Sequence, residues 1–279
     1  MNNTFSFNRF KNLLVLDFKK YFRNFSTMLI VFCSLPAVFW IFNLLFGSTT
    51  DGIVRFGFIC VVVALAMLQV PSKVYGKANL SREGIGFAML PASSLEKFLS
   101  MFIYCAIVTP VLAFFGSYLV DAFLSVFPFG GFERPIHLYT INDLFRMIED
   151  NDGAVQTGDM AYPFDKIMPI GMMRTLFYLG IIEWAVIFML GNMLFKKHKA
   201  GKTFACYLGI SYVFSVIIGG VVFANTDRIK LWFEKISDFP TEKVIHMFHG
   251  ASVWCMVINI VVIALLLFFT YRKIQTQKY

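Results

Sequence analysis

Long apolar runs, separated by short polar segments, dominate the chain. A spanning helix needs about 20 mostly apolar residues, and six windows meet that length. They cover residues 27–46, 53–71, 98–120, 169–195, 204–224 and 251–271. Arg55 lies at the start of the second window, where a long side chain can extend to the headgroups, so this window is retained. The pattern predicts an all-α membrane protein with six transmembrane helices.

The segment before the first window has a different pattern. Between residues 5 and 25, aromatic residues and a leucine recur at spacings of three and four, and most basic residues fall on other faces. The apolar positions are Phe7, Phe10, Leu14, Phe18, Tyr21 and Phe25. This spacing predicts an amphipathic helix lying in the membrane interface. We expect it to occupy residues 1–26, ahead of a transmembrane domain over 27–279 in which Pro36 and Pro110 kink the first and third spans.

Composition supports a membrane environment. Hydrophobic residues make up 58% of the 279 positions and the mean hydropathy is +0.68, above the roughly 45–50% apolar share of soluble domains. The single core of a soluble protein of this length could not bury that much apolar surface. The net charge is +8. Because the basic residues cluster beside the apolar windows, we expect contact with anionic lipid headgroups and no binding of nucleic acid.

The distribution of Lys and Arg predicts orientation. The amino-terminal stretch, the 72–97 loop, the 196–203 loop and the carboxyl-terminal tail together hold sixteen, against seven in the 121–168 and 225–250 segments. The richer side is expected to be cytoplasmic. We therefore predict a multi-pass protein of the plasma (inner) membrane with both ends in the cytoplasm. Residues 121–168 would form a small extracellular insert, and 225–250 an extracellular or re-entrant segment.

The 72–97 loop carries the clearest local pattern. Ser93 and Glu96 have the spacing of a capping box, in which the hydroxyl accepts from the Glu96 amide and the carboxylate accepts from the Ser93 amide. Gly84 and Pro91 permit a sharp turn upstream. A helix should therefore begin beside Ser93 and continue without a break into the third span. Taken alone, the pattern also fits an ordinary capped helix entry, and loss of Glu96 from such a cap costs about 1 kcal/mol or less.

The run Leu-Pro-Ala-Ser-Ser-Leu-Glu-Lys-Phe at 90–98, between the second and third windows, resembles the membrane subunits of type 2 ABC transporters. The amphipathic amino-terminal helix and the hydrophobic segment before the last span share this resemblance. An insert of roughly 45 residues between the third and fourth spans is longer than that family often has. The resemblance implies that the loop docks on a separate ATPase. The ATPase-coupling residues it implies are Arg82, Glu83, Leu90, Pro91, Ser93, Leu95, Glu96 and Lys97.

The same resemblance implies an exporter permease that works as a dimer with a second permease subunit, with ATP bound on the partner ATPase. The chain itself offers no ATPase motif. Residues 196–203 end in Gly-Lys-Thr, but Lys196 replaces the first glycine of a P-loop and the segment joins two membrane helices. We therefore expect no enzyme activity and no cofactor in this chain. Glu242, His246 and His249 share helical spacing, but an interfacial segment is favoured there over a metal site.

Glu183 is the one ionisable residue deep within an apolar window. A carboxylate in the bilayer is costly, so it is a candidate either for the substrate path or for a structural hydrogen bond to Asn43, Gln69 or Asn259. Small residues recur at steps of four in the fifth window, in the series Ala205 and Gly209 and the series Ser211, Ser215 and Gly219. They predict a close helix–helix seam, within the subunit or across a dimer.

Three classes of function remain open from the sequence. An ABC permease ranks first on the resemblance. A secondary transporter or channel, which would need no ATPase and could use Glu183 for protons, is the alternative. A membrane enzyme ranks last, because the spans lack paired His or Asp motifs. The sequence does not identify the substrate.

Overall fold

The computed structural model describes most of the chain, and its described part is largely helical. The described residues are 5–47, 49–80, 84–127, 132, 154–157, 160–163, 170–226, 228, 231 and 241–276. Arg82 and Glu83, most of the predicted 121–168 insert, and residues 232–240 of the predicted 225–250 segment lie outside them.

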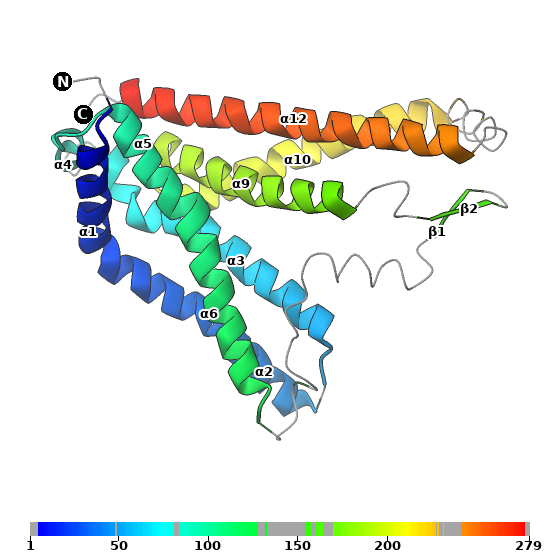
Figure 1. The fold of residues 1–279 in the computed structure, drawn as a ribbon, viewed down its shortest axis with the longest axis horizontal. Helices are drawn as coiled ribbons and strands as arrows, with labels where there is room; N and C mark the ends of the chain where they lie inside the picture. Colours follow the sequence, from blue (N-terminus) through cyan, green and yellow to red (C-terminus); the bar gives the residue numbers. More distant parts are fainter. Residues whose placement is uncertain are drawn as a thin grey trace. The chain divides into compact units, whose positions relative to one another are not determined.

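The described elements follow one another as helices, with one short hairpin (Figure 1). In chain order they are α1 Phe7–Cys33, α2 Leu35–Phe46, α3 Gly52–Val74, the 3-10 helix η1 Gly76–Asn79, α4 Ile85–Ala88, α5 Ser94–Phe102, the π-helix η2 Ile103–Val108, α6 Thr109–Leu124, β1 Ala154–Thr157, β2 Met160–Pro163, α9 Ile170–Leu194, α10 Lys199–Ala224 and α12 Thr241–Thr276. The strands are antiparallel, with Val155 opposite Tyr162. The hairpin falls in the predicted insert, so that segment is not wholly helical.

Six helical stretches among the described residues are long and apolar enough to cross a membrane, as the sequence predicts. They are Phe7–Phe46, Gly52–Val74, Ser94–Leu124, Arg174–Leu194, Lys199–Val221 and Ile245–Thr276. In the Lys199–Val221 stretch none of the apolar window is buried inside the chain, and in Ile245–Thr276 only 11% is. Apolar surface of this extent is stable only where lipid or another chain covers it.

The chain divides into two compact units. Unit 1 comprises residues 1–138, 181–204 and 263–279, and unit 2 comprises 139–180 and 205–262. Unit 2 therefore contains the hairpin, the start of α9, most of α10 and the first part of α12. A Cβ added at Gly209 or Gly219 meets no heavy atom within 4 Å, so the predicted small-residue seam is not formed within the described part of unit 2. A seam across a dimer stays a prediction.

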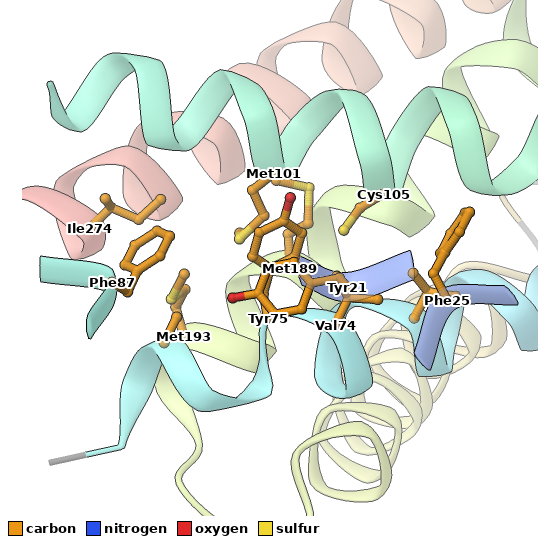
Figure 2. Close-up of a cluster of buried hydrophobic side chains, with 12 residues drawn as sticks. Tyr21, Phe25, Val74, Tyr75, Phe87, Met101, Cys105, Met189, Met193 and Ile274 are labelled. Carbon is orange, nitrogen blue, oxygen red and sulfur yellow. The ribbon is translucent and has the colours of Figure 1, made fainter. Parts of the chain in front are cut away.

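Unit 1 has one hydrophobic core that joins segments distant in sequence. Its buried members come from α1, α3, η1, α4, α5, η2, α9 and the end of α12. Figure 2 shows Tyr21 of α1 and Tyr75, which follows α3, side by side at its centre, with ring centroids 5.3 Å apart. Ile274 of α12 reaches the same cluster. Both the first and the last helix of the chain therefore pack on α5 and its neighbours.

The amino-terminal helix is longer than predicted. No boundary occurs at residue 26, because α1 runs on to Cys33 and the break falls at Ser34, just before Pro36. Pro36 thus interrupts the first span, as expected. The buried stripe is Phe10, Leu13, Asp17, Tyr21, Phe25 and Phe32. Phe7 and Phe18 are 69% and 48% exposed, so the predicted apolar positions divide between the protein core and the outer surface. A position of this helix in the membrane interface stays a prediction.

The third span is helical throughout but is not regular. The segment Ile103–Val108 between α5 and α6 is π-helical. The helix that begins beside Ser93 therefore continues to Leu124 without a break, as predicted, although it is not α-helical throughout. Pro110, near the start of α6, has no N–H to bond the carbonyl four residues before it, and its ring crowds that turn. A π turn widens the helix there, and the Thr109 hydroxyl donates to the Tyr104 carbonyl over 2.6 Å.

Candidate functional site

The capped helix start predicted at Ser93 is present. Helix α5 begins at Ser94, and the Ser93 hydroxyl accepts from the Glu96 amide over 3.2 Å. In return, the Ser93 amide donates to Glu96 Oε2 over 2.8 Å. Both halves of the capping box form, so the cap prediction is confirmed. The turn upstream includes the short helix α4 and Pro91.

Glu96 does more than cap its own helix. Its side chain is fully buried, with a relative exposure of 0%. Oε1 accepts from the Ser6 amide over 2.8 Å and from Arg9 Nη2 over 3.2 Å. Ser6 is the residue before α1. One carboxylate therefore binds the start of α1 to the start of α5, and three N–H groups compensate its burial.

Asp17 forms a second link between the same two helices. It is 2% exposed, and it accepts a hydrogen bond from the Ser100 hydroxyl over 2.7 Å and one from the Tyr75 hydroxyl over 3.4 Å. Burial, together with the nearby Asp17 charge, raises the pKa of Tyr75 well above its usual value, so this phenol stays protonated and remains a donor. Farther along, the Tyr104 hydroxyl donates to the Leu14 carbonyl over 2.9 Å.

We call the contacts of Ser6, Arg9, Leu14 and Asp17 with Glu96, Ser100 and Tyr104 the α1–α5 clamp. Sequence reasoning missed it. The signal for Asp17 was present, since it falls in register with Leu13 and Tyr21 on one helical stripe. An acid on the buried stripe of an amphipathic helix needs a partner, and that partner is supplied by a distant helix.

The other predicted coupling residues divide between buried and exposed positions. Lys97 is buried, with its ammonium 5.4 Å from the Phe87 ring centroid. Leu90 is half-buried and packs against the core. Pro91 and Leu95 are exposed. The predicted set therefore does not form one surface. Ser93, Glu96 and Lys97 support the loop from inside, and its outer face holds Pro91, Leu95 and the 79% exposed Met89.

The 72–97 loop is also tied to the connection between α9 and α10. The Asn79 side chain donates to the carbonyls of Met193 and Phe195 over 2.7 and 3.3 Å, and the Lys199 ammonium donates to the Gly76 carbonyl. Residues 195–198 join helix α9 to helix α10, and residues 199–203 of the predicted loop form the start of α10. The loop thus rests on α1 and on the α9–α10 connection.

Glu183 lies half-buried on α9. The next residue, Trp184, donates through Nε1 to the Ala64 carbonyl over 3.1 Å and fixes this part of α9 against α3. A hydrogen bond from Glu183 to Asn43, Gln69 or Asn259, and a role in a substrate path, both stay predictions. His246 and His249 are exposed on α12, and the Glu242 side chain lies outside the described set. Among described residues, no three metal-ligating side chains gather at one place.

A buried ion pair that the sequence did not reveal joins α3 to α6. Arg55 and Asp121 are 1% and 2% exposed, and Arg55 Nη2 lies 3.5 Å from Asp121 Oδ2. The Arg55 guanidinium also lies 4.2 Å from the Phe132 ring centroid. Arg55 was expected to extend to the headgroups from the helix start. That expectation was wrong, because an acid near the end of α6 and an aromatic ring enclose the guanidinium.

Comparison of the chain with family models, with characterised proteins and with solved structures finds no match. The geometry is therefore the ground for assigning a function. The described part of the chain is largely helical, and several of its helices are long and apolar enough to cross a membrane. The loop before α5 ends in a capped helix start that is bonded to the residue before α1.

Proposed function

We propose that the chain is the membrane-spanning permease subunit of an ABC transporter, an exporter driven by a separate ATPase that docks on the 72–97 loop. The observation that supports this most is the capped start of α5 at Ser93 and Glu96. From Ser94 the chain stays helical to Leu124, through the π segment. A force applied at the loop would therefore act directly on a membrane helix.

The buried contacts make the loop a stiff element. Glu96 is held by three N–H donors, and Asp17 holds Ser100 one turn farther along α5. A buried network of this kind resists local unfolding. A partner would touch the exposed Met89, Pro91 and Leu95, while the residues beneath them carry the displacement to α5 and α1.

The remaining assignments belong to the same proposal. Both ends are cytoplasmic in a plasma (inner) membrane, and ATP is bound by the partner subunit. A second permease subunit completes the substrate path, and lipids cover the rest. Support comes from the end of α12, where Tyr271 packs 5.9 Å from the Phe98 ring of α5, and from the start of α1, which meets the same helix at Glu96. Helices that begin and end the chain thus meet at one end of unit 1.

The test first identifies an ATPase that co-purifies with the unaltered chain, and then replaces residues 90–95 with a Gly/Ser run in a chain co-expressed with that ATPase. We expect normal membrane insertion, loss of ATPase co-purification and loss of any permease-dependent change in ATP hydrolysis. The matched control places Gly/Ser at residues 196–198, in the other basic loop, and should retain the ATPase. Unchanged co-purification and unchanged hydrolysis in the 90–95 variant would refute the coupling role.

The Arg55–Asp121 pair favours a second candidate, a secondary transporter. Charged pairs within spans are expensive and often mark ion or proton pathways. This reading needs no ATPase. The purified chain alone is reconstituted in liposomes, with an electrochemical gradient as the only energy source. Proton movement under these conditions, and its loss in Asp121→Asn, would favour a secondary transporter over an ABC permease.

A further inference from the structure

A basic depression opens beside the loop, between the end of α3 and the α9–α10 connection. Its volume is about 350 Å³. The lining side chains that matter here are Lys73, Lys77, Lys196, Lys199, His198 and Ser72. None of its described lining residues is acidic. Positive groups gathered in one hollow repel one another, so the hollow favours a ligand that carries negative charge.

The two walls of the depression are joined by the chain's own contacts. Asn79 binds the Met193 and Phe195 carbonyls from one wall to the other, and Lys199 bonds the Gly76 carbonyl. Helices α9 and α10 approach so closely behind it that a Cβ at Gly191 would lie 1.9 Å from the Thr203 hydroxyl oxygen. His198 has a φ of 49°, a left-handed conformation that is uncommon outside glycine and that other contacts must hold. The backbone segments that carry the basic groups are therefore held together before any ligand arrives.

An exposed apolar stripe leads from this depression along α3. Val61 and Leu65 are 55% and 41% exposed, and they stand four residues apart on the helix, with Ser72 of the depression seven residues beyond Leu65. Positions at these spacings lie on one face of a helix. An anionic head bound by the lysines would thus have its apolar tail beside Val61 and Leu65. A free phosphate ion or an acidic protein surface would make no use of this stripe.

We propose that the depression is a binding site for the phosphate group of an anionic phospholipid, with its acyl chains along α3. Basic hollows between membrane helices are suited to such headgroups. The test places the purified protein in nanodiscs of phosphatidylcholine containing one-fifth phosphatidylglycerol. Bound phosphatidylglycerol is counted by native mass spectrometry. The site variant is Lys73, Lys77 and Lys196→Gln. The matched control removes three exposed cations outside the amino-terminal helix and the basic loops, with Arg174, Arg228 and Lys243→Gln.

We expect the site variant to lose phosphatidylglycerol roughly tenfold or more, since each lysine near an anionic headgroup contributes about fivefold, and the control to retain it. Both variants must match the parent in elution and melting temperature in pure phosphatidylcholine. If the triple variant does not, Lys73→Gln with Lys196→Gln replaces it. Equal retention in the site variant, or equal loss in the control, would overturn the proposal.

Two further experiments distinguish a lipid phosphate from the other possible occupants, which are a free phosphate ion and an acidic protein surface. Inorganic phosphate is added to protein in phosphatidylcholine nanodiscs. If it raises the melting temperature of the parent and not of the site variant, while phosphatidylglycerol has no effect, the ligand is free phosphate and the lipid assignment fails. If the site variant keeps phosphatidylglycerol but no longer co-purifies with an ATPase, the hollow receives an acidic protein surface instead. This proposal requires only a membrane, so it stands or falls separately from the ABC assignment.

Discussion

The Ser6 amide donates a 2.8 Å hydrogen bond to the Glu96 carboxylate, although the two residues are separated by 90 positions. This bond joins the residue that precedes α1 to the first turn of α5. Arg9 and Ser93 complete the set of donors around the same buried carboxylate. The spacing of Glu96 from Ser93 predicts only a cap on α5. In the structure the same side chain also holds the start of α1 in place.

Replacing Glu96 with Ala should destabilise the protein by about 2–3 kcal/mol, because the Ser6 and Ser93 amides and the Arg9 guanidinium lose a charged acceptor in a buried site. This exceeds the 1 kcal/mol or less expected of the cap alone. Arg9 is 33% exposed, so the control Arg9→Gln should cost less than about 1 kcal/mol. Thermal unfolding in detergent measures both. Equally small losses of stability in Glu96→Ala and Arg9→Gln would show that the hydrogen bond from Ser6 to Glu96 does not stabilise the folded protein.

Removing one member of the Arg55–Asp121 pair should be far more damaging than removing both. Arg55→Leu leaves a carboxylate buried without its cation and should cost about 3–5 kcal/mol. Arg55→Leu combined with Asp121→Leu should recover most of that loss, because no charge then remains buried. A double variant no more stable than Arg55→Leu in the same melting experiment would contradict a close pairing in the folded protein.

Glu183→Gln should leave expression nearly intact, whereas Glu183→Leu should impair assembly or transport. The amide of Gln can still hydrogen-bond within the apolar span, and leucine cannot. The yield of monodisperse protein after purification checks the first half, and transport by the complex checks the second. Identical behaviour of the two variants would remove any role for a polar group at this position.

Topology can be tested with single cysteines in a background whose five native free cysteines have been replaced. Asn151→Cys should react with a membrane-impermeant maleimide in intact cells, because the 121–168 segment is poor in Lys and Arg. Thr276→Cys, at the end of α12, should react only after permeabilisation. The reverse labelling pattern would invert the orientation.

Local patterns predicted the local structure well. Ser93 and Glu96 are three residues apart, so their cap was visible in the sequence, and the apolar windows located the six long helices. The pairs Ser100–Asp17 and Ser6–Glu96 span 83 and 90 positions, and no periodicity says which distant helix a polar side chain will meet. The apolar positions of the amino-terminal helix divide for a related reason, since Phe10 and Tyr21 are buried whereas Phe7 and Phe18 face outward. In lipid, an apolar side chain is stable on the outer face as well, so apolar spacing alone does not identify the buried side.

Site-specific photo-crosslinking in living cells tests, without knowledge of the substrate, whether an ATPase contacts the outer face of the 72–97 loop as proposed. A photoreactive amino acid replaces the 79% exposed Met89, and the matched control replaces the 42% exposed Phe127, just after α6. We expect the probe at Met89 to capture a polypeptide that carries a P-loop and binds ATP, and the probe at Phe127 not to capture it. Capture of no ATPase at Met89 under conditions in which the protein is inserted and stable, or equal capture at both positions, would contradict the proposed contact.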